Sequence, residues 1–370
     1  MSKLKLLHAA DLHLDSPFEG LPAGKAAIRR SEQRLLLKKI AETAETEQVD
    51  MVLLAGDLFD SDSAYAETAE ELERTLGSLS MPVFIAPGNH DYYSARSPYA
   101  RMRFGKNVHV FRNSFIECVE LPELGARVFG AAFTDKYSHE LLRGFTADKK
   151  PGVTDILCIH GEVGGTARYN SIGENDIAHS GMDYIALGHI HTGSGLKKSG
   201  LTYYAWPGCP EGRGFDETGE KQIYIVEVGD RDCRIQPVCV AERKYEILPV
   251  EVGKNEPVAA IREALPENTA KDIYRIILRG ETDDTPDVSN IKVALENRFF
   301  SLQLRDETSI RRDIWEKTGD DSLRGLFLLK MRTAYDAAGS DTEREKITQA
   351  VRWGLAAMDK REEVVRHDDR

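Results

Sequence analysis

Side chains able to bind metal ions or to move protons occur in five short motifs within the first 191 residues. The motifs are Asp11-Leu-His13, Gly-Asp57-Leu-Phe-Asp60, Gly-Asn89-His90-Asp91, an isolated His160 and Gly-His189-Ile-His191. Imidazole and carboxylate ligands together suit manganese, iron or zinc, and one carboxylate can bridge two ions about 3.5–4 Å apart. Any single pair arises often by chance, in a turn or a core. The ordered set of five favours a two-metal hydrolytic centre, with Asp57 as the candidate bridging ligand.

The spacing inside the motifs predicts how these side chains converge. In extended backbone, residues two apart point to the same side, so Asp11 and His13, and likewise His189 and His191, are expected to face one cluster. A glycine directly precedes three of the motifs, where a chain leaving a strand is expected to turn sharply without a Cβ clash. These glycines are Gly56, Gly88 and Gly188.

The hydrophobic pattern places the motifs in an alternating β/α framework. Residues 4–9, 51–55 and 83–86 are short apolar runs typical of buried strands, and a motif follows each of them. Apolar residues recur at helical spacing between these runs, at Ile28, Leu35, Leu36, Ile40 and Ala44 and then at Ala69, Leu72, Leu76 and Leu79. Closely spaced strand patterns follow from about residue 107 onward. The order predicts stacked sheets with outer helices and functional loops at the strand ends.

Composition indicates a folded protein in a reducing environment. The 370 residues are 41% hydrophobic and 30% charged, and no apolar run approaches the roughly 20 residues needed to cross a bilayer. Five cysteines form no Cys-x-x-Cys pair, which fits a cytoplasmic location. The net charge of −12 argues against unaided binding to a polyanion, although metal ions held by the acidic motifs would reverse the local sign.

In this order, the five motifs resemble the calcineurin-like metallophosphoesterase superfamily over about the first 220 residues. The segments His-Ala-Ala-Asp-Leu-His-Leu-Asp-Ser-Pro-Phe at 8–18 and Trp-Pro-Gly-Cys-Pro-Glu-Gly-Arg at 206–213 are similar to the SbcD-type DNA repair exonuclease family, particularly its YhaO-like branch. The resemblance implies an α/β fold, with a four-layer α-β-β-α metallophosphoesterase sandwich, a smaller α+β capping domain and C-terminal helices. The expected boundaries are 1–240 for the metallophosphoesterase (nuclease) domain, 241–306 for the capping domain and 307–370 for the C-terminal helical region.

The resemblance also implies a role for each site residue. One ion would be held by Asp11, His13 and His191 and the other by Asn89, His160 and His189, with Asp57 between them. His90 would bind no metal. As the family's catalytic histidine it would stabilise the charge on the phosphate and protonate the departing oxygen. Asp60 would orient this histidine.

The function implied is that of a two-metal-dependent phosphodiesterase, a DNA nuclease (exonuclease or endonuclease) in DNA repair that uses a metal-bridging hydroxide for in-line attack. Mn²⁺ is the expected ion, with Fe²⁺ or Zn²⁺ as alternatives. A second interpretation keeps the chemistry and changes the substrate to a nucleotide or phosphoprotein. A third is a non-catalytic subunit that binds DNA ends.

Other segments carry further expectations. Basic residues after His90, interleaved with aromatic ones, could contact phosphates and stack bases, or could form a solvated helix face or a subunit contact. They are Arg96, Arg101 and Arg103 with Tyr92, Tyr93, Tyr99 and Phe104. Arg213 is a further candidate contact to the DNA backbone. The C-terminal helices could dock onto an SbcC-like coiled-coil ATPase or simply cover the capping domain, and family members are often homodimers. His8, within the first strand, is expected to be a packed, hydrogen-bonded residue.

Overall fold

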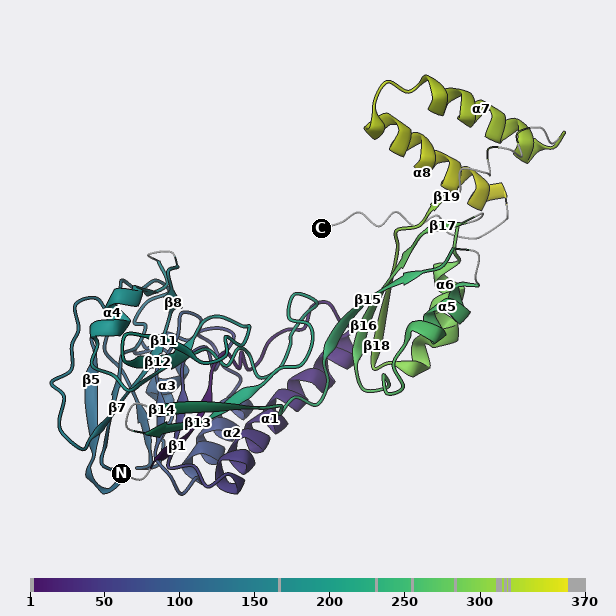
Figure 1. Ribbon diagram of the computed structural model, residues 1–370. Helices are drawn as coiled ribbons and strands as arrows, with labels where there is room; N and C mark the ends of the chain where they lie inside the picture. Colours follow the sequence, from purple (N-terminus) through teal and green to yellow (C-terminus); the bar gives the residue numbers. More distant parts are fainter. Residues whose placement is uncertain are drawn as a thin grey trace. The chain divides into compact units, whose positions relative to one another are not determined.

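The computed structural model describes residues 3–165, 168–229, 232–253, 256–282, 285–310, 315, 318 and 321–358. The chain forms two compact units, Met1–Lys244 and Tyr245–Arg370, and each is described by itself (Figure 1). Residues 359–370, at the end of the expected C-terminal region, lie outside the described residues. None of the described helices combines the length and the apolar composition needed to cross a bilayer.

Two six-stranded mixed sheets form the centre of the first unit. The first has the order β14-β13-β1-β2-β3-β4, formed by Asp232–Val238, Ile223–Gly229, Leu4–Ala9, Met51–Leu54, Val83–Ile85 and Val108–Val110. The second has the order β11-β12-β10-β7-β6-β5, formed by Lys197–Ser199, Thr202–Ala205, Tyr184–Gly188, Thr154–His160, Ala126–Gly130 and Glu117–Leu121. Strands β1 to β4 run parallel, and so do β12, β10, β7 and β6.

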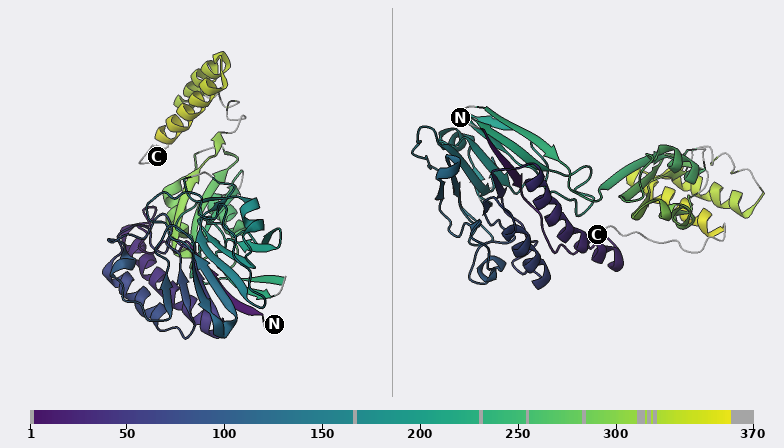
Figure 2. Two further views of the ribbon diagram at one scale, coloured as in Figure 1. Left: turned by 90° about the vertical axis from the view of Figure 1, so that its left-hand side faces the viewer. Right: turned by 90° about the horizontal axis from the view of Figure 1, so that it is seen from below.

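The two sheets pack face to face, and helices cover their outer faces (Figures 1 and 2). One core joins the sheets, with Leu6 and Phe84 from the first and Val128 and Ile156 from the second. Another core joins the first sheet to α1 (Ala23–Thr46) and α2 (Ala66–Gly77), and a third joins the second sheet to α4 (Glu174–His179). Shorter elements are α3 (Pro98–Arg101), β8 (Glu162–Val163) and β9 (Ser171–Ile172). This α-β-β-α layering confirms the predicted fold class.

The parallel strands carry the motifs to one edge of each sheet. Strands β1, β2 and β3 are neighbours, and Asp11, Asp57 and Asn89 follow their carboxyl ends. In the second sheet, His160 ends β7 and pairs with the last residue of β10, so His189 lies directly beyond that pair. Because carboxyl ends of neighbouring parallel strands meet at one edge, motifs far apart in the chain come together there.

The second unit contains a parallel three-stranded sheet, and Figure 1 shows helices α5 and α6 on one of its faces. The strands are β15 (Tyr245–Glu251), β16 (Ile273–Arg279) and β18 (Ser301–Asp306), and the helices are α5 (Pro257–Ala264) and α6 (Val288–Leu295). The short strands β17 (Glu281–Thr282) and β19 (Ser309–Ile310) pair with each other. Helices α7 (Leu323–Ala337) and α8 (Asp341–Met358) form a hairpin around Leu328, Val351 and Leu355.

Candidate metal centre

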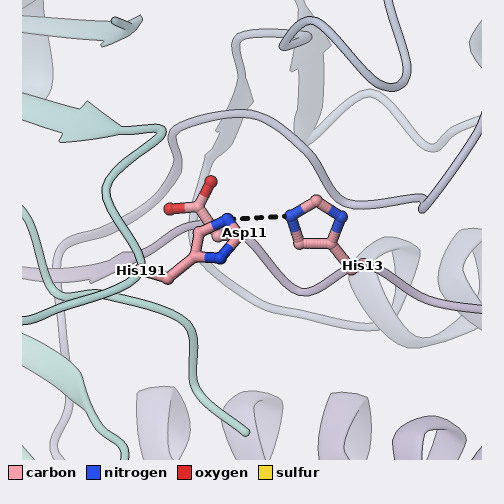
Figure 3. A group of neighbouring side chains, drawn as sticks. All are labelled: Asp11, His13 and His191. Carbon is pink, nitrogen blue, oxygen red and sulfur yellow. Dashed lines mark hydrogen bonds between the residues drawn. The ribbon is translucent and has the colours of Figure 1, made fainter. Parts of the chain in front are cut away.

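Asp11, His13 and His191 form one half of the candidate centre (Figure 3). The Nε2 atoms of His13 and His191 lie 3.2 Å apart. One ligand atom from each of the three residues lies within 4.8 Å of the other two. The backbone N–H of His189 donates to the Asp11 carboxylate at 3.0 and 3.1 Å, which fixes this buried side chain against the loop after β10. Possible metal-ligand atoms from two loops thus face one small space.

Asp57, Asn89, His160 and His189 form the other half. The Nε2 atom of His160 lies 3.3 Å from Oδ2 of Asp57 and 3.0 Å from Oδ1 of Asn89. The Nδ1 atom of His189 lies 3.1 Å from the same Asn89 oxygen. Oδ2 of Asp57 is also 3.9 Å from Nε2 of His13. The Asp57 carboxylate therefore stands between the two halves, and all seven expected ligand side chains gather in one place.

The hydrogen bonds behind two imidazoles determine which nitrogen faces the centre. Nδ1 of His13 lies 3.0 Å from Oδ1 of Asp60, and Nδ1 of His191 lies 2.7 Å from Oε1 of Glu217. Because an ionised carboxylate only accepts, each Nδ1 carries the hydrogen, and a ring in its neutral form directs the lone pair of Nε2 into the same space. Two lone pairs at this separation need a proton or a cation between them. The donor set fits a divalent cation.

Burial and mutual charge shift the pKa values of these groups in opposite directions. Burial raises the pKa of Asp11 to about 6 and lowers the pKa of His13 to about 4. Burial alone would lower the pKa of His160, but the negative charge of Asp57 raises it to about 9. The same attraction holds the pKa of Asp57 below its usual range despite burial. Buried carboxylates beside imidazoles are costly unless a positive charge joins them, which a metal ion supplies.

Four of these residues have a left-handed backbone: Asp11 (φ 54°), His13 (φ 44°), Asp57 (φ 50°) and His189 (φ 91°). The expectation that extended backbone aligns the paired ligands is therefore wrong. The side chains converge because the chain turns sharply just beyond the strand ends. Such conformations cost about 1–3 kcal/mol each and persist where the surrounding structure demands them.

The glycines before the motifs serve mainly to let loops approach each other. Gly188 and Gly88 do not have positive φ. A Cβ at Gly188 would lie 1.9 Å from the carbonyl oxygen of Ala55, and one at Gly88 would lie 2.2 Å from a carboxylate oxygen of the neighbouring loop. At Gly56 a sharp turn is also required, since φ is +90° and a Cβ would lie 2.4 Å from Nδ1 of His160. The expected turn is thus found at one position of the three.

His90 lies beside the cluster and is exposed, with its ring centre 4.8 Å from that of His13. Its backbone N–H donates to Oδ1 of Asp57 at 2.9 Å, and Nδ1 donates to the main-chain carbonyl of Asp60 at 3.0 Å. Nε2 is therefore the nitrogen left for a substrate. Asp60 contacts His90 through its main chain, whereas its carboxylate contacts His13 and Arg213. The orienting group is a backbone carbonyl rather than a side chain.

Glu217 is a site residue that sequence reasoning missed. Its side chain is 5% exposed and accepts hydrogen bonds from His191 and from Nη2 of Arg213, the latter at 2.7 Å. These bonds hold the pKa of Glu217 below its usual range, against the effect of burial. Nη1 of Arg213 also donates to Oδ1 of Asp60 at 2.9 Å. Arg213 thus bridges Asp60 and Glu217, the carboxylates that accept from His13 and His191. The four-residue spacing between Arg213 and Glu217 is the one sequence signal that could have indicated Glu217.

In the segment after His90, where DNA contacts are expected, the arginines and Tyr99 differ in their exposure to solvent. Arg96, Arg101 and Arg103 are exposed. Tyr99 is 3% exposed and its hydroxyl donates to Asp91, so its ring faces the core. The interpretation of Tyr99 as a base-stacking residue is wrong.

Two buried polar residues position the motifs from behind. Asp91 accepts hydrogen bonds from the backbone N–H of Leu58 at 2.7 Å and of Gly88 at 2.8 Å, which ties the loops after β2 and β3 together. His8 is fully buried and its ring nitrogens lie 2.9 Å from the Tyr184 hydroxyl and 3.1 Å from a backbone carbonyl oxygen. The prediction of a packed, hydrogen-bonded His8 is confirmed.

The layered fold and the clustered donors define a metallophosphoesterase. Residues 4–193 match the family described as calcineurin-like phosphoesterase, and the chain belongs to this family, whose members use divalent metals. The chain is 28% identical over 342 residues to the uncharacterized metallophosphoesterase YhaO of Bacillus subtilis, covering 83% of each chain. It is 27% identical to the DNA double-strand break repair protein Mre11 of Aeropyrum pernix, covering 67% of this chain and 64% of that protein. It is 24% identical to a subunit of the nuclease SbcCD of Bacillus subtilis, covering 60% of this chain and 66% of that protein.

Proposed function

We propose that this protein is a two-metal-dependent phosphodiesterase of the SbcD type and that DNA is its substrate. The observation that carries the proposal is the convergence of the seven expected metal ligands from five motifs, with the ring of His90 4.8 Å from that of His13. The similarity to proteins named as a DNA break repair protein and as part of a nuclease supports DNA as the substrate. We further propose that the protein acts in DNA repair in the cytoplasm.

In this proposal, Asp11, His13 and His191 hold one ion, and Asn89, His160 and His189 hold the other. Asp57 contributes to both, which agrees with its place near both His13 and His160. Mixed imidazole and carboxylate ligands favour Mn²⁺ as the physiological ion over Mg²⁺, which prefers oxygen ligands alone.

The chemistry divides between the ions and the protein. Two divalent ions bound there would neutralise the phosphodiester and lower the pKa of a water molecule toward neutrality. His90 holds its Nδ1 hydrogen on the Asp60 carbonyl, so a protonated ring presents Nε2–H to the oxygen that leaves phosphorus. The backbone N–H of His90 binds Asp57, which keeps this ring at a fixed distance from the cluster. No covalent bond between enzyme and substrate is needed.

The second unit is proposed to contribute substrate and partner contacts. The three-stranded sheet unit would serve as a capping domain for DNA. On the α7–α8 hairpin, large apolar side chains are exposed to solvent at Leu323, Leu326, Leu329 and Trp353. Exposed apolar groups in one hairpin support docking to a helical partner, for which we propose an SbcC-like coiled-coil ATPase. A homodimer is proposed on family resemblance.

The test is a matched hydrolysis assay with Mn²⁺, Mg²⁺ or chelator on linear duplex DNA, single-stranded DNA and bis-p-nitrophenyl phosphate. We expect manganese-dependent cleavage of DNA and of the diester. His90→Ala should lose about 10²–10⁴-fold in rate with unchanged metal content, because it removes the proton donor and no ligand. His179→Ala, which removes an exposed histidine at the end of α4, is the matched control. Full activity of His90→Ala would contradict the proposed mechanism.

A small phosphodiester is the second candidate substrate, and one observation favours it. A hollow of about 420 Å³ borders His191 and is lined by Thr192, Cys209, Asp216 and Lys221, among others. This volume lies within the range of small-molecule sites. Cleavage of nucleotide diesters without cleavage of any DNA would favour this candidate.

A further inference from the structure

A row of aromatic rings leads from the candidate metal centre to the surface. The ring of Tyr169 lies 5.3 Å from that of His189, with 31° between their planes. The ring of Tyr137 lies 5.6 Å from that of Tyr169. Tyr169 is half-buried, whereas Tyr137 is 49% exposed. The row therefore begins at an expected metal ligand and ends in a ring that solvent can reach.

Two cations flank the outer ring. Nζ of Lys136 lies 6.0 Å from the ring centre of Tyr137, and the guanidinium carbon of Arg168 lies 5.9 Å from it. Both side chains are exposed. These distances are at the outer limit of a cation–π contact. Both charged groups therefore lie near the ring and remain available to bind a phosphate. In a chain of net charge −12, they concentrate positive charge beside one accessible tyrosine.

Hydrogen bonds hold this row in place. The backbone N–H of Ser138 donates to the carbonyl of Arg168 at 3.0 Å, and the N–H of Asn170 donates to the carbonyl of Ser138 at 3.2 Å. The Asn170 side chain donates to the carbonyl of His160 at 2.7 Å. The two segments that carry the rings are thus bound to each other and to a motif of the metal centre, so a ligand stacking on Tyr137 would meet a preformed surface.

We propose that Lys136, Tyr137 and Arg168 form a tyrosine platform on which an unpaired base of a DNA strand stacks, while the two cations bind its phosphates. Stacking on an aromatic face suits any base, and cations beside it neutralise the backbone. Bases inside a duplex are already stacked on each other, so the platform selects single-stranded DNA. The inference rests on the proposed function for the reaction at the adjacent phosphate, but the binding step needs no hydrolysis.

The test measures the affinity of the full chain, with Mn²⁺ present, for a fluorescent single-stranded oligodeoxythymidylate whose phosphorothioate linkages resist hydrolysis, by anisotropy. Tyr137→Ala should weaken binding at least about five-fold, the lower end of the effect of one base–aromatic stack. Tyr137→Phe keeps the ring and should bind like the wild type. Arg168→Gln should reduce the slope of log affinity against log salt by about 0.7.

The matched control is Tyr203→Ala. Tyr203 also has a lysine over its ring, with Lys198 Nζ at 4.3 Å, but it pairs with Tyr184, at the end of β10 opposite to the metal motif. It should leave the affinity unchanged. Unaltered affinity of Tyr137→Ala, an equal loss in Tyr203→Ala, or equal wild-type affinity for blunt duplex would overturn the inference. The proposed function is judged separately, by manganese-dependent hydrolysis of linear DNA and of bis-p-nitrophenyl phosphate.

Discussion

Glu217 illustrates how much of the centre depends on residues that face no ligand. It fixes the tautomer of His191 through Nδ1, while Asp60 does the same for His13, and Arg213 joins the two carboxylates. A carboxylate behind an imidazole raises its basicity and holds the ring at one angle. Substitution at Glu217 is therefore expected to change metal binding without removing an expected ligand.

We expect Glu217→Gln to weaken Mn²⁺ binding by about 10–100-fold, because the amide accepts a weaker hydrogen bond from His191 and leaves Arg213 with less opposing charge. Isothermal titration with Mn²⁺ measures this directly. Glu67→Gln, which alters an exposed residue of α2, is the control and should bind like the wild type. Equal affinities in all three proteins would remove Glu217 from the centre.

At the scale of the residue, the sequence predicts which side chains come together. It does not predict the backbone conformation or the supporting residues that bring them together. The ordered motifs lead to seven side chains that the structure gathers in one cluster. Neither Glu217 nor the left-handed backbone of Asp11 and Asp57 follows from the motifs. A carboxylate 26 residues from its histidine leaves no periodic signal, and a positive φ at a non-glycine residue depends on the loops packed around it.

At the scale of the element, the loop after β10 is held against the loop after β2 by close contact at Gly188. A Cβ there would lie 1.9 Å from the Ala55 carbonyl oxygen and 2.7 Å from Nδ1 of His160. Both neighbours are fixed, since Nδ1 of His160 donates to that same carbonyl at 2.9 Å. The close approach of the two sheets at this edge therefore depends on the missing side chain of Gly188.

We expect Gly188→Ala to destabilise the protein by about 1–3 kcal/mol, the usual cost of overpacking, and to lower metal occupancy because it displaces His160. Urea unfolding and metal analysis of the purified variant provide the measurements. Gly24→Ala, in the first turn of α1 where a Cβ meets nothing within 4 Å, should be neutral or stabilising by up to about 1 kcal/mol. Similar losses in both variants would show that the contact at Gly188 has no special importance.

Element types were more predictable than the faces they bury. The helical stripe in α1 is correct for Leu36, Ile40 and Ala44, which are buried, but Ile28 and Leu35 are 47% and 52% exposed. A single helix offers more apolar residues than one sheet can cover, and spacing alone does not choose among them. The layering of the sheets follows from the strand order. Which residues of a helix are buried against a sheet depends on side-chain packing.

At the scale of the whole molecule, metal binding and folding of the first unit are expected to be linked. The donors come from both sheets, so the ions would join elements separated by more than 100 residues of chain. A ligand that binds only the folded state stabilises it by about 2.7 kcal/mol at 100 times its dissociation constant. All seven expected ligands belong to the first unit.

We therefore expect Mn²⁺ at saturating concentration to raise the unfolding temperature of the first unit by about 5–10 °C. Differential scanning calorimetry with and without chelator measures the shift. Asp57→Asn should lose most of it, because Asp57 lies between both halves of the centre, while Asp62→Asn, at an exposed position, should retain it. The same shift in Asp57→Asn and wild type would place the bound metal elsewhere.

The positive φ values of Asp11, His13, Asp57 and His189 also bear on how this protein could be redesigned. At each position a glycine would relax the main chain and remove an expected metal ligand, but it would also leave buried groups without partners, such as the backbone N–H of His189 that donates to Asp11. The strain at these positions therefore comes together with the contacts that the side chains make, and a redesign of the loops would have to replace those contacts before it relaxed the main chain.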